Sequence, residues 1–107
     1  MLQQSLSRDE AIERGLIIIG DGSSVAPSVR IVPAEDDGRS FGPVEIGAGT
    51  IVRDAVILCT GVRIGDRVLV GHHCVLRRGV RIGDDSVLSH LISVQHEVAI
   101  GARVRVS

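Results

Sequence analysis

The sequence has few of the side chains that fill a wide protein core. Its 107 residues include one aromatic residue, Phe41, and no tryptophan, tyrosine or lysine. Large rings usually fill wide cores, so an apolar fraction made almost wholly of Val, Ile, Leu and Ala favours a narrow, repetitive structure built in thin layers. The short length also limits the chain, residues 1–107, to a single domain with a modest core.

Other shortages exclude whole classes of protein. The two cysteines, Cys59 and Cys74, are too few for a disulfide scaffold. No apolar run approaches the roughly 18 residues of a membrane span, and residues 1–15 lack the apolar segment of a signal peptide. A net charge of −1 gives no indication of nucleic-acid binding. We therefore expect a cytoplasmic protein with neither a membrane nor a nucleic-acid partner.

A strict repeat of six residues is the strongest pattern that is present. A large aliphatic residue occupies the first position of every hexad, at Ile46, Val52, Leu58, Ile64, Val70, Leu76, Ile82, Leu88, Val94, Ile100 and Val106. The fifth position is always small or branched, from Thr50 to Val104, and includes Cys74. An amphipathic helix cannot keep a period of six, and a flat strand would alternate by two without regular breaks. We expect the first and fifth positions to point into the core, which makes Cys74 a core residue.

A longer period of eighteen residues is superimposed on the hexads. The dipeptide Ile-Gly recurs at this spacing, as Ile46-Gly47, Ile64-Gly65, Ile82-Gly83 and Ile100-Gly101. Three hexads therefore form one coil, and equivalent residues of successive coils stack. One short strand and one corner per hexad give three flat parallel sheets in a triangular prism. Gly49, Gly61 and Gly79, at the fourth position, suit corners that require unusual backbone angles.

The segments "IGAGTI", "IGDRVL", "IGDDSV" and "IGARVR" resemble the hexapeptide-repeat family. The resemblance covers about 60 continuous residues and implies an all-β fold, the left-handed parallel β-helix. The left hand is implied by the resemblance alone, because the general rule for parallel crossovers gives the opposite hand.

The residues before the repeat predict a short helix and one inserted loop. Ser7 and Glu10 have the spacing of a capping box and Gly15 suits a C-cap, so we expect a helix over residues 8–14 that covers the N-terminal end of the prism. This gives an N-terminal segment, residues 1–18, followed by β-helix coils over residues 19–107. Hexads headed by Ile19, Val25 and Ile31 precede an acidic loop at residues 33–45.

The end of the sequence interrupts a coil. The coil that begins at Ile100 stops after eight of its eighteen residues, and no capping segment follows. Natural solenoids cap such ends. We therefore expect either a C-terminally truncated chain or a partner that covers this end.

Three histidines occupy third positions, at the corners of the prism. His72 and His90 are eighteen residues apart, so we expect them to stack on one edge. His96 lies one hexad further on, which places it on the next edge, away from the other two.

Most members of the hexapeptide-repeat family are acyltransferases. The resemblance implies a homotrimer with active sites between subunits, an acyl thioester of coenzyme A or of acyl carrier protein as donor, and a histidine as general base. "VQHEVAIG" resembles the His-acid-x-x-Ile-Gly segment of the sugar O- and N-acetyltransferase branch. This implies that His96 is the base, that Glu97 orients it, and that acetyl-CoA acetylates a hydroxyl or amine of a sugar or nucleotide sugar. His72 and His90 are alternative catalytic or acceptor-lining residues, and a solvated corner remains the alternative for His96.

The resemblance also implies basic residues around the phosphates of coenzyme A. Residues 1–45 carry four arginines and eight acids, whereas residues 46–107 carry eight arginines and five acids. Within the second part, Arg77, Arg78 and Arg81 form the nearest basic cluster and are candidate phosphate ligands. A solvated, basic surface is the simpler explanation for these three arginines.

Two other classes of function stay open. The γ-class carbonic anhydrases share the fold and bind zinc through three histidines from two subunits. They pair the last two histidines at a spacing of five, whereas His90 and His96 are six apart, and their Gln-Asp pair is missing, so we expect no metal. The other class is a non-catalytic β-helix, as a scaffold or a fragment.

Overall fold

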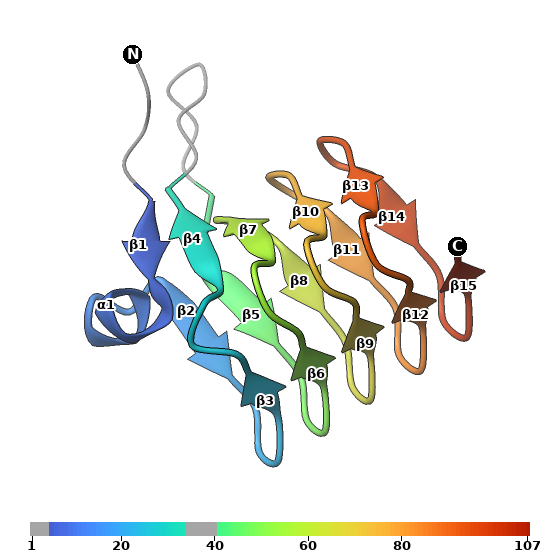
Figure 1. The fold of residues 1–107 in the computed structure, drawn as a ribbon, viewed down its shortest axis with the longest axis horizontal. Helices are drawn as coiled ribbons and strands as arrows, with labels where there is room; N and C mark the ends of the chain where they lie inside the picture. Colours follow the sequence, from blue (N-terminus) through green and yellow to red (C-terminus); the bar gives the residue numbers. More distant parts are fainter. Residues whose placement is uncertain (1–4, 34–40) are drawn as a thin grey trace.

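A computed structural model describes residues 5–33 and 41–107, which form a triangular prism of short strands with one end covered by a helix (Figure 1). Helix α1 spans Arg8–Glu13. The strands are β1 (Leu6–Ser7), β2 (Ile17–Ile19), β3 (Ser24–Val25), β4 (Arg30–Val32), β5 (Val44–Ile46), β6 (Ile51–Val52), β7 (Ile57–Cys59), β8 (Arg63–Ile64), β9 (Leu69–Val70), β10 (Val75–Leu76), β11 (Arg81–Ile82), β12 (Val87–Leu88), β13 (Ser93–Val94), β14 (Ala99–Ile100) and β15 (Arg105–Val106).

Three sheets of five strands each run through the described residues. Sheet A has the order β1-β4-β7-β10-β13, sheet B β2-β5-β8-β11-β14 and sheet C β3-β6-β9-β12-β15. Every third strand along the chain therefore returns to the same sheet, as the repeat of three hexads predicted. Among the described ladders, all are parallel except the one between β1 and β4.

The register follows the eighteen-residue period, with one interruption. Ile64 pairs with Ile82, and Ile82 pairs with Ile100. Ile19 instead pairs with Ile46, 27 residues further on, so nine extra residues enter the chain after β4. The expected loop over residues 33–45 is shorter at its C-terminal end, because Val44 already pairs with Ile17 in sheet B. Residues 34–40 of that loop lie outside the described part of the chain.

The core consists of the first and fifth positions, as predicted. The leucines Leu58, Leu76 and Leu88 are fully buried, and Cys74 points inward with 0% exposure. Its Sγ donates to the carbonyl of Ser89 at 3.0 Å, and burial raises the pKa of the thiol. In the last coil the fifth-position valines are partly open, and Val104 is 38% exposed.

The corners have left-handed backbone angles at the fourth position of each hexad. The prediction for glycine is confirmed, with φ of 67° at Gly49, 87° at Gly61 and 71° at Gly79. However, seven non-glycine residues of the described chain adopt the same conformation, including Glu97 at 59°. This conformation costs such residues about 1–2 kcal/mol each, so coil packing, and not glycine alone, enforces the corners.

A steric cause explains the glycine of the Ile-Gly dipeptide. A Cβ atom on Gly83 would lie 2.5 Å from the carbonyl carbon of Gly101 in the next coil. A Cβ on Gly71 would similarly lie 2.8 Å from the backbone nitrogen of His90. At these glycines the backbones of successive coils therefore approach too closely for a side chain, whereas other second positions hold Arg53, Cys59 and Arg77.

The N-terminal helix forms as expected. Ser7 Oγ accepts from the backbone N–H of Glu10 at 3.1 Å, and the Ser7 N–H donates to Glu10 Oε1 at 3.0 Å, which completes the capping box. The helix ends at Glu13, and Gly15 follows with φ of 70°. Ala11 is fully buried against the first coil, so α1 covers this end of the prism (Figure 1). Strand β1, which extends sheet A next to β4, was not predicted.

Candidate functional site

The three edges of the prism carry different rows of third-position residues. We call them the Asp edge (Ala48, Asp66, Asp84, Ala102), the His edge (Asp54, His72, His90) and the His96 edge (Thr60, Arg78, His96). Because the coils stack in register, each residue lies over its counterpart eighteen residues away. Chemistry at an edge therefore depends on which side chains follow one another at that period.

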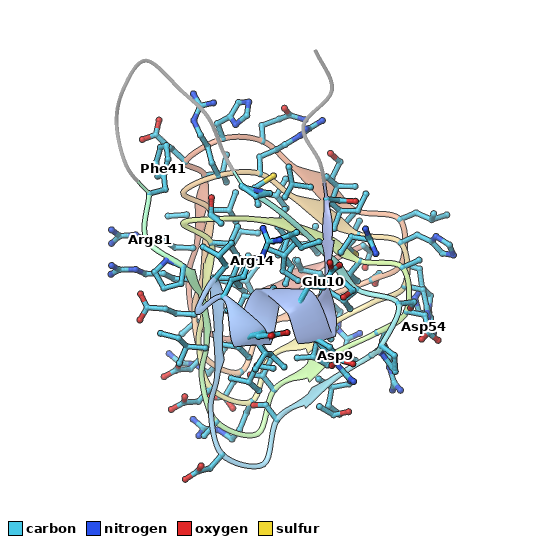
Figure 2. All side chains as sticks on the ribbon, turned by 90° about the vertical axis from the view of Figure 1, so that its left-hand side faces the viewer. Asp9, Glu10, Arg14, Phe41, Asp54 and Arg81 are labelled. Atoms are coloured by element: carbon cyan, nitrogen blue, oxygen red, sulfur yellow. The ribbon has the colours of Figure 1, made fainter. Side chains whose placement is uncertain are left out.

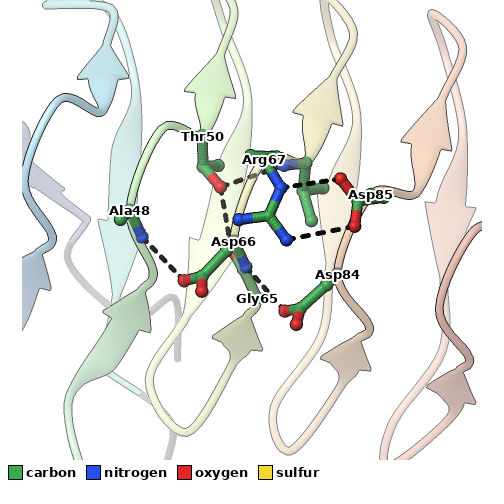
Figure 3. A network of polar contacts seen from close by, with 8 residues as sticks. Ala48, Thr50, Gly65, Asp66, Arg67, Asp84 and Asp85 are labelled. Carbon is green, nitrogen blue, oxygen red and sulfur yellow. Dashed lines mark hydrogen bonds and ion pairs between the residues drawn. The ribbon is translucent and has the colours of Figure 1, made fainter.

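The Asp edge is a structural ladder (Figure 3). Asp66 Oδ1 accepts from the backbone N–H of Ala48 at 2.9 Å, and Asp84 Oδ1 accepts from that of Asp66 at 2.8 Å. Beside them Arg67 donates to both oxygens of Asp85, at 2.8 and 3.1 Å. These carboxylates are used to join one coil to the next.

The His edge repeats this bond with an imidazole. The backbone N–H of His72 donates to His90 Nδ1 at 2.9 Å, and the two rings lie 4.8 Å apart, which confirms the predicted stacking. Asp54 Oδ2 lies 3.8 Å from His72 Nδ1, and Ser28 Oγ donates to Asp54 Oδ1 at 3.3 Å. A ring nitrogen that accepts an N–H carries no proton, so the neutral His90 ring is protonated at Nε2.

His96 lies on a different edge from the other two histidines, as predicted. It follows β13 and precedes β14, at the corner between sheets A and B, whereas His72 and His90 lie between sheets C and A. His96 and its neighbour Glu97 are both exposed. An exposed imidazole at a corner can reach a substrate from outside the prism.

A groove of about 520 Å³ runs beside the His96 edge. It is lined by corner residues and by the outer face of sheet B: Phe41, Gly42, Pro43, Glu45, Gly61, Arg63, Gly79, Arg81, Glu97 and Ala99. Of the two residues predicted as base and orienting partner, Glu97 lines the described groove and His96 stands next to it in the chain. Phe41 and Arg81 lie on this side of the prism, opposite Asp54 (Figure 2).

Two glycines form the floor of this groove. A Cβ atom on Gly61 would lie 2.9 Å from the Cβ of Phe41, and one on Gly79 would lie 2.9 Å from Glu97 Cγ. Other corners have the same φ with larger residues. The backbone angle alone therefore does not require glycine at these two corners. Glycine is required because a side chain there would collide with Phe41 or Glu97.

The three candidate phosphate ligands occupy different hexad positions: Arg77 is second, Arg78 is third and Arg81 is sixth. Arg81 lies on sheet B and lines the groove, whereas the Arg78 guanidinium lies 5.7 Å from the centre of the Phe41 ring. Within the described part of the chain, Arg78 Nε is buried without a hydrogen-bond partner. Arg77 is exposed and occupies the second position of its hexad, near Cys59. Burial raises the pKa of the Cys59 thiol, and the positive charge of Arg77 opposes this rise.

Sequence reasoning did not identify Phe41, Glu45 or Arg63 as part of a site. The signal for Arg63 was present, because it is eighteen residues from Arg81 and pairs with it across sheet B. The signal for Phe41 was only its isolation as the one aromatic residue, since it lies outside the repeat.

Within residues 5–33 and 41–107, no three His, Cys, Asp or Glu side chains are grouped so that they could hold a metal ion. In the same residues, no helix is long and apolar enough to cross a membrane.

The fold is the left-handed parallel β-helix of hexapeptide-repeat proteins. The chain is similar to a variant of perosamine N-acetyltransferase from Caulobacter crescentus, in complex with CoA and GDP-perosamine, with 24% identity and a TM-score of 0.58 over 91% of this chain. The chain spans about half, 49%, of that acetyltransferase. A variant of AntD, an N-acyltransferase from Bacillus cereus in complex with dTDP and coenzyme A, has 17% identity and a TM-score of 0.47, over 99% of this chain and 81% of its own. No family model matches the sequence, nor does any curated protein.

Proposed function

We propose that this chain is the β-helix of an acyltransferase that moves an acetyl group from acetyl-CoA to a hydroxyl or amine of a sugar or nucleotide sugar. The observation that carries the proposal is the exposed His96-Glu97 pair at a prism corner, with Glu97 lining the groove of about 520 Å³. The structural neighbour from Caulobacter crescentus, which binds CoA and GDP-perosamine, supports the same chemistry.

In this proposal His96 is the general base. Its imidazole takes a proton from the acceptor hydroxyl or amine as that atom attacks the thioester carbonyl. The new C–O or C–N bond forms, the C–S bond breaks, and the imidazolium returns the proton to the departing sulfur. Glu97 is the positioning residue, whose carboxylate stabilises the imidazolium.

A homotrimer is part of the proposal, in which a second prism would cover the groove. The outer face of sheet C supports such packing, since Ile51, Leu69 and Val87 form an apolar row at the sixth positions. Ile51 is 39% exposed, and a contiguous apolar row, rather than a single exposed residue, is what marks an interaction surface.

The test is turnover of acetyl-CoA with a panel of amino sugars and nucleotide-linked amino sugars. The readout is the free thiol of coenzyme A, which is detected with a thiol reagent. Both cysteines are buried, so the protein contributes little background to a thiol reagent. Replacing a general base typically lowers kcat by about 100-fold to 10,000-fold, so we expect His96→Ala to lose turnover while it still binds coenzyme A.

His73→Ala is the matched control, because His73 is an exposed corner histidine on a different edge. Loss of turnover in His72→Ala or His90→Ala, with a fully active His96→Ala, would move the base to the His edge. One zinc ion per chain without coenzyme A binding would contradict acyl transfer.

A further inference from the structure

We infer that Arg63 and Arg81 form a binding site for the diphosphate group of a ligand that lies in the groove beside Glu97. The two arginines are at sixth positions of successive coils, and both point outward from sheet B. Their assignment as a pair depends on the register of the sheet and not on any contact with a known ligand.

The register places two like charges side by side. Arg63 pairs with Arg81 in the parallel ladder between β8 and β11, and neighbouring strands are about 4.8 Å apart. Directly opposed like charges destabilise a sheet. An anion between the two guanidinium groups removes this repulsion, and phosphate oxygens match the donor geometry of arginine.

The carboxylates nearby leave Arg81 available. Glu45 pairs with Arg63, with 3.4 Å between Glu45 Oε2 and Arg63 Nε, and both side chains are about half-exposed, at 47% and 60%. Exposed pairs of this kind contribute little. In sheet B, Arg81 lies between Arg63 on one neighbouring strand and Ala99 on the other. Within the described residues, Arg81 forms no ion pair with a carboxylate.

The shape of the groove fits an extended ligand with one charged end. Its volume of about 520 Å³ lies within the range of small-molecule sites. Gly61 and Gly79 line the groove together with the aromatic ring of Phe41. Glu97 lies along the same groove, so a ligand held at Arg63 and Arg81 reaches the corner of His96.

The role of this site in acyl transfer rests on the proposed function, whereas diphosphate binding does not. Coenzyme A and nucleotide sugars both carry a diphosphate, so the donor and the acceptor are the two possible sources. The experiment is isothermal titration of the full chain with coenzyme A and, separately, with UDP and GDP, at low and at physiological salt.

We expect at least one of these ligands to bind, and Arg81→Gln and Arg63→Gln each to weaken it by about 10-fold to 100-fold. Arg53→Gln is the control, because it removes the same charge from an exposed second-position residue that does not line the groove. An effect on coenzyme A assigns the site to the donor, and an effect on UDP or GDP assigns it to the acceptor.

The inference is overturned if none of the three ligands binds the wild-type chain, or if both glutamine variants bind as the wild type does. An equal loss in Arg53→Gln would also overturn it, since net charge alone would then explain binding. His96→Ala separates the two proposals: retained turnover refutes the base but not the site, because diphosphate binding is measured without reaction.

Discussion

The close approach of successive coils at Gly83 predicts a severe effect of one methyl group. In Gly83→Ala the new Cβ would lie 2.5 Å from both the Gly101 carbonyl carbon and the Ala102 nitrogen. Carbon atoms in normal contact are about 3.5–4.0 Å apart. The obstacle is backbone, which no rotamer change can move, so the two coils must separate by about 1 Å.

The magnitude follows from what that separation disrupts. Overpacking a tight interior costs about 1–3 kcal/mol. The backbone bond from Gly83 N–H to the Ile100 carbonyl, at 2.7 Å, is lengthened as well, and a typical hydrogen bond contributes about 0.5–1.5 kcal/mol. We expect Gly83→Ala to lower the free energy of unfolding by about 3 kcal/mol.

The same dipeptide supplies the control. A Cβ on Gly101 would meet only Val104 Cγ2, at 4.0 Å, and neither glycine has a positive φ. Gly101→Ala should therefore leave stability unchanged or raise it by about 0.4–1 kcal/mol, through the reduced entropy of the unfolded chain.

The assay is urea unfolding followed by far-UV circular dichroism, because the chain lacks tryptophan and tyrosine. With a slope of about 1–3 kcal/mol per molar urea, Gly83→Ala should lower the midpoint by at least about 1 M. If the two variants have equal midpoints, or if Gly83→Ala matches the wild type, close backbone approach is not the reason for the Ile-Gly repeat.

Two further predictions concern polar contacts between coils. Ser86 is fully buried, and its hydroxyl donates to one carbonyl at 2.7 Å and accepts one backbone N–H at 3.0 Å; Ser86→Ala should cost about 1–3 kcal/mol in urea unfolding, while the exposed Ser93→Ala should cost little. The hydrogen bond from Arg67 lowers the pKa of Asp85 below its ordinary 3.8. The pair therefore adds stability above pH 3.8 that is lost as pH falls through the lower, folded-state pKa. Stability of the wild type and of Asp85→Asn, measured against pH, should converge in acid; a constant difference would refute this linkage.

The separation of the histidines illustrates what a repeat can predict. Once the period is eighteen, the positions of His72 and His90 follow from counting residues, and their rings are indeed 4.8 Å apart. The placement of His96 on the next edge follows in the same way. Identical coils stack in identical register, so sequence distance converts directly into spatial distance.

Features outside the repeat could not be derived by counting. Strand β1 pairs antiparallel with β4, and Phe41 packs over the corners of Gly61 and Gly79. Both come from segments whose path depends on where they find apolar surface, not on a period. Phe41 lines the groove from outside the repeat, so the groove could not be derived by counting residues.

The sequence by itself determined the coil, its core, its corners and the edge on which each histidine lies, because these depend on a local period that every coil repeats. Only the tertiary structure decided that Ile-Gly marks a steric limit, that Glu97 faces a groove, and that Arg63 and Arg81 stand there together with an aromatic wall. These properties arise between coils, where backbone spacing and the packing of an inserted residue determine which side chains share a surface.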